Sequence, residues 1–274
     1  MNSVPPPSRR MNRAVWRAGA AHAGERVLAE ETPVALTYDG ATQAVMMATP
    51  ADLEDFAIGF SLTEGFVRSP ADISGVDIAP TADGVDVRIW LRGDAGATIV
   101  ARRRRMLGAS GCGMCGLESL AEANRPVPVV TADPRFGPAS LAAALALLPA
   151  AQTLNQQTRA VHGAAFWQPG RDLLAREDVG RHNALDKLAG AMARSGRSTA
   201  TGILLLSSRI SVEMVQKAAM IGAPILVAVS APTALAVRIA EAARITLVGV
   251  AREDGFEVFT HPGRIEIGAH DHVV

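Results

Sequence analysis

The C-terminal half of the chain alternates short apolar runs with segments of helical period. Continuous apolar runs of this kind are typical of strands that are covered on both faces. A segment after Ser211 has apolar residues at helical spacing, and Pro232 begins another. This alternation predicts a mainly parallel sheet flanked by helices. The predicted strands are residues 202–207, 225–229 and 246–251, with residues 257–260 as an added edge strand.

The N-terminal part has shorter elements. Two β-rich stretches are separated by Asp39-Gly40, a dipeptide that favours a tight hairpin turn. A segment with acidic residues near its start and apolar residues four apart then predicts a helix. The pattern therefore predicts a small α+β unit. Its elements are a hairpin over residues 30–47, a helix from Pro50 to near Gly65, and strands over residues 76–78 and 85–91.

Local composition divides the chain into three parts. The first 24 residues hold three prolines and four arginines before the first acidic residue, Glu25, and predict a disordered basic tail. Residues 126–138 are rich in turn-forming residues and predict a crossing between two domains. The expected organisation is a tail over residues 1–24, a small α+β domain over 25–137 and an α/β domain over 138–274, which makes the chain α+β overall.

The charge and composition of the chain argue against some classes of binding partner. Lys and Arg number 27, as do Asp and Glu, so the formal net charge is zero and no general nucleic-acid or membrane surface is indicated. Aromatic residues make up 4% of the 274 residues, too few to suggest stacking platforms for single-stranded nucleic acid. No apolar stretch reaches the roughly 18 residues of a membrane span. A reduced, cytoplasmic location suits a chain with two cysteines and no disulfide framework.

The two cysteines, Cys112 and Cys115, lie three apart among glycines. Such a segment predicts a permissive loop that presents both sulfurs outward. An arginine run at residues 102–105 lies just upstream, and cations lower the pKa of a thiol towards the reactive thiolate. Three interpretations are open: a reactive thiol pair, half of a metal site completed by His162, His182 or a second copy of the chain, or chance spacing.

Polar residues also crowd the start of a predicted helix at residues 176–187. Arg181 and His182 are expected near its N-terminus, where backbone N–H groups favour an anion such as phosphate. Helix capping with surface salt bridges is an equally open interpretation.

A third candidate site follows the predicted parallel strands. Ser207 and Arg209 come directly after one strand, and Ser230 comes after the next. Ligands of open α/β sheets bind outside the carboxyl ends of the strands, and hydroxyls beside a guanidinium suit a phosphate-bearing ligand. Each segment by itself is also a common helix cap. His162 has small neighbours that permit close approach of a ligand, and a core histidine is the alternative interpretation.

Several motifs together resemble the formate dehydrogenase accessory sulfurtransferase family. The resemblance extends from about Glu30 to about Ile265, and its most specific segment is the ten-residue run at 178–187. The motifs stand in the family's order: Leu-Thr-Glu-Gly at 62–65, Cys-Gly-Met-Cys-Gly at 112–116, Asp-Val-Gly-Arg-His-Asn-Ala-Leu-Asp-Lys at 178–187, Val-Gln-Lys-Ala-Ala at 215–219 and Ser-Ala-Pro at 230–232.

This resemblance implies a cytoplasmic homodimer whose larger domain has a three-layer, cytidine deaminase-like fold. It implies that the protein takes sulfur from a cysteine desulfurase as a cysteine persulfide. The sulfur then goes to the molybdenum bis(molybdopterin guanine dinucleotide) cofactor before that cofactor enters the formate dehydrogenase catalytic subunit. By the same resemblance Cys112 carries the persulfide and Cys115 is its partner. The family's cofactor-binding segment falls on Val250, Ala251, Arg252, Glu253, Asp254 and Gly255.

The chain departs from the family pattern at Arg159-Ala160, at Ser208 and at Gly255, all near the expected cofactor crevice. Two other functions stay open. A zinc-dependent, deaminase-like hydrolase would need a His-x-Glu element, which the sequence lacks. A non-catalytic chaperone for the cofactor would not need the thiols. A thioredoxin-like oxidoreductase is disfavoured, because its cysteine pair should open a helix.

Overall fold

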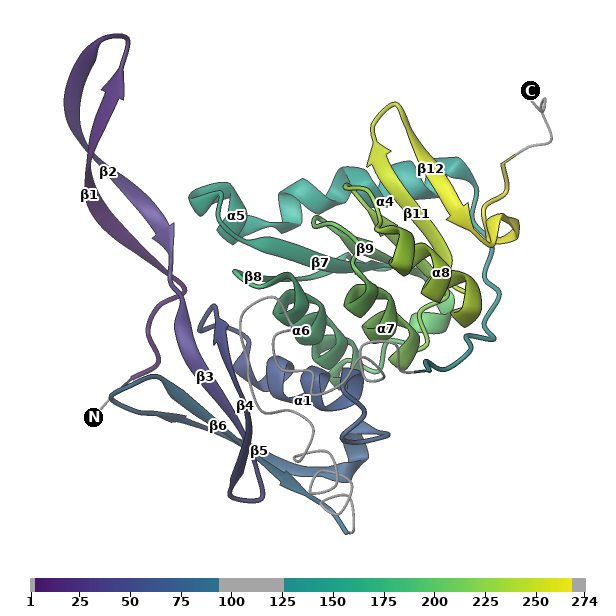
Figure 1. Cartoon of the computed structure of the whole chain (residues 1–274), viewed down its shortest axis with the longest axis horizontal. Coiled ribbons are helices and arrows are strands. Elements are labelled where there is room, and N and C mark those ends of the chain that lie inside the picture. The colour runs from purple at the N-terminus through teal and green to yellow at the C-terminus, as the bar shows by residue number, and fades with distance from the viewer. Residues whose placement is uncertain (1–2, 94–125, 268–274) are drawn as a thin grey trace.

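The computed structural model describes residues 3–93 and 126–267. The N-terminal part forms a four-stranded sheet of order β4-β3-β6-β5, with one helix packed on it (Figure 1). β3 pairs antiparallel with β4 and parallel with β6, and the hairpin turns at Asp39-Gly40 as predicted. The predicted α+β unit is confirmed. Its elements are β3 (Thr32–Tyr38), β4 (Ala41–Ala48), α1 (Leu53–Thr63), β5 (Ile73–Pro80) and β6 (Val85–Leu91).

The C-terminal part is built on a six-stranded sheet of order β12-β11-β10-β9-β7-β8. The three predicted strands β9, β10 and β11 are parallel neighbours, and β12 pairs antiparallel with β11 at the edge. β7 and β8 form an antiparallel hairpin that the sequence pattern did not predict. These strands are β7 (His162–Trp167), β8 (Leu174–Asp178), β9 (Ile203–Leu206), β10 (Ile225–Ala228), β11 (Thr246–Arg252) and β12 (Gly255–Thr260).

Helices cover both faces of this sheet, which gives three layers (Figure 1). Successive strand residues point to opposite faces. Leu204 and Leu206 accordingly pack with α6, α7 and α8, whereas Ile203 and Leu205 pack with α4. The three-layer arrangement is therefore confirmed. The helices are α4 (Pro138–Ala151), α5 (Thr153–Thr158), α6 (Arg181–Arg194), α7 (Val212–Met220) and α8 (Ala234–Ala243), and short 3₁₀ turns lie at Pro70–Asp72, Thr199–Thr201 and Pro262–Arg264. No helix of the described ranges is long and apolar enough to cross a bilayer.

The two parts meet where α1 crosses α6. A Cβ added to Gly59 would lie 1.6 Å from the carbonyl oxygen of Asp186, and one added to Gly190 would lie 1.9 Å from that of Asp55. The helix backbones are therefore in direct contact, and only glycine permits this distance. Because this crossing is so close, side chains of α1 reach the polar residues of α6.

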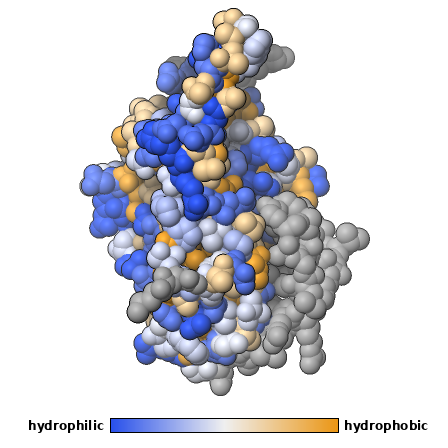
Figure 2. Space-filling view, turned by 90° about the vertical axis from the view of Figure 1, so that its left-hand side faces the viewer, coloured by the Kyte–Doolittle hydropathy of each residue, from blue (hydrophilic) through white to orange (hydrophobic). Residues whose placement is uncertain are grey.

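The expected disordered tail is wrong over most of its length. β1 (Ser8–Arg17) and β2 (Ala20–Ala29) pair antiparallel along their full length, with a turn at Ala18-Gly19 where both residues have positive φ. The hairpin projects from the body and is the protrusion at the top of Figure 2. Most of its side chains are exposed, so the strands lack the apolar alternation that identifies a half-buried strand. The arginines that suggested disorder lie on this exposed hairpin.

Candidate functional site

The predicted polar residues gather at one edge of the six-stranded sheet. Since β9 and β10 are parallel, Ser207 and Ser230 follow strands that end at the same edge. β7 runs the opposite way, so its first residue, His162, lies there too, paired with Asp178 at the end of β8. The backbone N–H of Gly163 donates to Ser207 Oγ at 2.8 Å. We call this region the strand-end edge. The prediction that these segments lie together is confirmed, whereas their role in binding a ligand stays a prediction.

Positive charge collects around His162 at this edge. Burial lowers the pKa of the half-buried His162, and the charges of Arg181, His182 and Arg209 lower it further, against the opposing effect of Asp178. The imidazole is therefore neutral near pH 7, while the two arginines remain cationic. An anionic group placed here would meet guanidinium groups and the N-terminus of α6 together.

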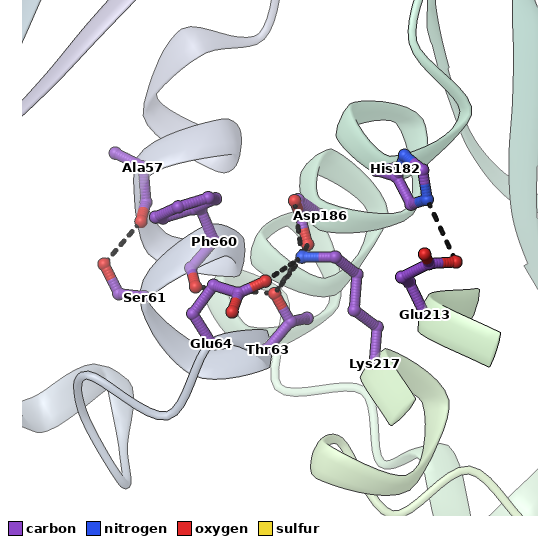
Figure 3. A network of polar contacts seen from close by, with 9 residues as sticks. All are labelled: Ala57, Phe60, Ser61, Thr63, Glu64, His182, Asp186, Glu213 and Lys217. Atoms are coloured by element: carbon purple, nitrogen blue, oxygen red, sulfur yellow. Dashed lines mark hydrogen bonds and ion pairs between the residues drawn. The ribbon is translucent and has the colours of Figure 1, made fainter. Parts of the chain in front are cut away.

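His182 faces a carboxylate on the next helix that the sequence analysis missed. His182 is 5% exposed, and its Nε2 lies 3.8 Å from Glu213 Oε2, too far for a hydrogen bond (Figure 3). Burial raises the pKa of Glu213, but His182 and Ser211 outweigh burial and bring the pKa to about 2. Glu213 is thus ionised at neutral pH. No local sequence signal pairs Glu213 with His182. Glu213 stands four residues before Lys217 and His182 four residues before Asp186, but this equal spacing has meaning only because Lys217 and Asp186 pair in the structure.

Unpartnered polar atoms are concentrated between the starts of α6 and α7. Within the described residues, six buried side-chain atoms have no hydrogen-bond partner, and four of them lie here. Neither helix has a side-chain cap hydrogen bond at its N-terminus. A buried polar group without a partner costs about 1–3 kcal/mol, so these atoms need hydrogen bonds from water or from a bound molecule. The four atoms are Arg181 Nε, His182 Nε2, Ser211 Oγ and Glu213 Oε2.

Other members of the 178–187 run are structural. Asp178 and Lys187 form a fully buried ion pair at 2.6 Å. Lys187 Nζ also donates to the carbonyl oxygen of Thr49 at 2.8 Å, and the Thr49 N–H donates to Asp178 at 2.9 Å. Asn183 Nδ2 donates to Asp178 and to the carbonyl oxygen of Met47, both at 2.9 Å. These contacts fix the start of α6 against the N-terminal part and leave Arg181 and His182 at the strand-end edge.

A second buried network joins α1, α6 and α7. Lys217 Nζ lies 2.9 Å from Asp186 Oδ1, 2.7 Å from Glu64 Oε1 and 3.1 Å from Thr63 Oγ1 (Figure 3). Burial lowers the pKa of Lys217, but Asp186 and Glu64 outweigh burial and raise it, so the ammonium is retained. The network fixes α6 against α7 one turn below the pair formed by His182 and Glu213.

The segment assigned by resemblance to the cofactor spans the end of β11, the turn and the start of β12. Arg252 pairs with Gly255 across the turn, and Glu253 and Asp254 form its exposed tip. Val250 has φ 52, a left-handed conformation that is rare for a β-branched residue. Its N–H donates to the carbonyl oxygen of Ser230, and Arg252 donates to that of Val229. The segment from Val250 through Ala251 to Gly255 therefore lies beside the end of β10, at the strand-end edge, and its binding role stays a prediction.

The departures from the family pattern have local structural settings. Arg159 ends α5 with φ 59, a conformation that glycine adopts more easily. Ser208 is buried, and its hydroxyl donates to the carbonyl oxygen of Arg209. Gly255 borders open space, since an added Cβ would meet nothing within 4 Å.

The predicted thiol site lies outside the described residues. This applies to Cys112, to Cys115 and to the arginine run at 102–105, so their roles stay predictions. Within the described ranges, no group of three or more His, Cys, Asp or Glu side chains could hold a metal ion. The zinc alternative depends on the cysteines and is therefore also untested.

Comparison with known proteins gives consistent matches along the chain. The model of the FdhD/NarQ family matches residues 29–266. A sulfur carrier protein FdhD of Agrobacterium fabrum is 50% identical over 265 residues, covering 96% of this chain and 98% of that protein. Its counterpart in Brucella abortus is 51% identical over 260 residues, covering 94% and 97%. A crystal structure from Desulfotalea psychrophila, described as a formate dehydrogenase accessory protein, superposes with a TM-score of 0.73 at 26% identity, covering 95% of this chain and all of the other.

Proposed function

The chain belongs to the FdhD/NarQ family, and on that basis we propose that it is a sulfur carrier for formate dehydrogenase. It accepts sulfur from a cysteine desulfurase as a persulfide on Cys112. It then passes the sulfur to the molybdenum bis(molybdopterin guanine dinucleotide) cofactor, its substrate, before the cofactor enters the formate dehydrogenase catalytic subunit. The observation that carries this proposal is identity of about half the residues, over nearly the whole chain, to proteins named sulfur carriers.

The proposed transfer uses both cysteines. The Cys115 thiolate attacks Sγ of Cys112, and the bond from that Sγ to the terminal sulfur breaks. The terminal sulfur leaves as sulfide for the molybdenum, and the two cysteines are oxidised to a disulfide. The electrons balance because the sulfane sulfur gains the two electrons that the thiols lose. A cellular dithiol must then reduce the disulfide before the next turnover.

The strand-end edge supports a dinucleotide acceptor. Its guanidinium groups, on Arg181 and Arg209, and the N-termini of α6, α7 and α8 favour phosphate groups. The four unpartnered buried atoms supply further hydrogen-bonding positions. The residues present therefore fit a ligand that carries several phosphates and polar heterocycles. We include His162, Ser207, Ser230 and the Val250–Gly255 segment in the proposed binding site.

Mass spectrometry of the thiols tests this proposal. The chain is incubated with a cysteine desulfurase and cysteine, alkylated and digested. One added sulfur is expected on the Cys112 peptide, absent from Cys112→Ala and present in Cys115→Ala. No added sulfur on the wild-type peptide, or an unchanged total in Cys112→Ala, would reject the carrier role. Stoichiometric zinc that is lost in Cys112→Ala would instead favour the hydrolase, and full function of Cys112→Ser would favour the chaperone.

We also propose, from the family resemblance, that the protein acts in the cytoplasm as a homodimer. Sedimentation of the full chain tests the dimer, which a purely monomeric distribution at micromolar concentration would contradict.

A further inference from the structure

We infer that Glu213 recognises the 2-amino-4-oxopyrimidine edge, the group that guanine and pterin rings share. The inference rests on the proposed function, because that function supplies a substrate containing both rings. The inference goes further than the proposed function because it names the residue that binds the ring and the hydrogen-bonding edge of the ring that this residue recognises. Glu213 would be a specificity-determining residue of the strand-end edge.

The geometry provides a carboxylate that is held in place and has one oxygen, Oε2, without a hydrogen-bond partner. Glu213 lies in the first turn of α7, its side chain is 14% exposed, and Oε2 has no hydrogen-bond partner. Figure 3 shows Glu213 and His182 pointing towards each other from two helices. His182 is 5% exposed and also unpartnered at Nε2. The place thus combines two helix N-termini with a deeply buried polar side chain that lacks a partner.

The unpartnered atoms match this heterocycle in type. The 2-amino-4-oxopyrimidine edge carries a ring N–H and an amino N–H side by side, with a carbonyl oxygen next to them. A carboxylate accepts from both N–H groups, as it does in other bidentate pairs. The neighbouring donors, Arg181 Nε, Ser211 Oγ and His182 Nε2 in the tautomer that carries its hydrogen there, can donate to the carbonyl oxygen. A simple anion fits this position poorly because Glu213 would repel it.

The buried network around Lys217 holds the Glu213 carboxylate opposite His182. Lys217, one turn along α7 from Glu213, is bound to Asp186 on α6 at 2.9 Å. That contact fixes the two helices against each other and so keeps Glu213 opposite His182. The low pKa of Glu213 means that the group is a charged acceptor at neutral pH.

Calorimetric titration of the full chain with GDP and with IDP tests the inference. The two nucleotides differ only in the 2-amino group. A hydrogen bond to a charged group corresponds to about tenfold or more in affinity, so GDP should bind at least about tenfold tighter than IDP. In Glu213→Gln the ratio should fall towards one, whereas Glu241→Gln, at the far end of α8, should keep it. If melting shows that the amide variant does not fold, Glu213→Asp replaces it, with the same expected fall.

The outcomes are separable from those of the sulfur-transfer experiment. Equal wild-type affinity for GDP and IDP, no binding of either, or a Glu213 variant that keeps the full preference would overturn the inference. The persulfide measurement on Cys112 would then still decide the carrier role. Competition with 6-hydroxymethylpterin identifies the ring: displacement of GDP means that Glu213 recognises the shared edge in either ring, and no displacement means that it recognises guanine alone.

Discussion

Asp178, the last residue of β8, and Lys187 of α6 form an ion pair whose side chains are both completely buried. Both ends of the pair also bind the backbone of Thr49, which belongs to the N-terminal part of the chain. The ten-residue run that is most specific to the family thus joins the two parts of the molecule, while its second and third polar side chains, Arg181 and His182, face the strand-end edge.

Removing one member of this pair should destabilise the protein strongly. In Lys187→Met the Asp178 carboxylate stays buried without its cation, which costs about 3–5 kcal/mol in comparable proteins. The free energy of unfolding in urea measures the loss. Arg10→Ala, which breaks the exposed pair of Arg10 and Glu25, is the matched control and should leave it unchanged within error. A Lys187→Met chain as stable as wild type would contradict this account of the interface.

The crossing of α1 and α6 should not tolerate a single added methyl group. In Gly190→Ala the new Cβ would overlap the backbone of Asp55, so the helices must separate and the free energy of unfolding should fall by about 3 kcal/mol. Gly263→Ala places the same group in open space and serves as the control. Equal melting temperatures for the two variants would show that the helices do not pack this closely.

Glu213 should contribute to stability in a defined pH range. Its pKa is about 2 in the folded chain, below the ordinary value of 4.5 for a glutamate, so the unfolded state binds the proton more readily. The contribution is complete above about pH 4.5 and is lost as the pH falls towards about 2. After screening by solvent we expect about 2 kcal/mol. The difference in unfolding free energy between wild type and Glu213→Gln, measured across this range, should shrink with acidification; a constant difference contradicts the assignment.

His162 should titrate below its ordinary range. Burial and the charge of Arg181 both disfavour the imidazolium, so NMR titration should place the pKa of His162 below 6.5. Arg181→Ala removes one of these causes and should raise that pKa, and His162→Gln assigns the resonance. An unchanged pKa in Arg181→Ala would mean that the two side chains do not share the strand-end edge.

Much of the fold follows from local patterns, because buried parallel strands carry continuous apolar runs. The runs before Ser207 and Ser230 identified β9 and β10, and the rule for parallel sheets then placed both serines at one edge. The β1–β2 hairpin was not predicted because its side chains are mostly exposed, so its sequence lacks the alternation of apolar and polar residues that indicates a strand. β7 and β8 were not predicted because their sequences contain small and charged residues where a buried strand usually has a continuous apolar run.

The candidate site was harder to predict than the fold because the residues that contact each other there lie far apart in sequence. Arg181 and His182 were identified from a helix start, but nothing local shows that Glu213 lies opposite His182. Lys187 and Asp178 stood in the same motif as the predicted anion site, yet their partner is Thr49, more than a hundred residues earlier. Only the packing of α1, α6 and α7 separates the residues that hold the helices from those that face a ligand.

Formate oxidation in cells tests the central claim most directly. A strain that lacks its own accessory protein is complemented with the wild-type chain, with Cys112→Ala or with the control Glu241→Gln, at equal protein levels. The account predicts that wild type and the control restore formate dehydrogenase activity and that Cys112→Ala does not. Full activity with the Cys112→Ala chain would contradict it.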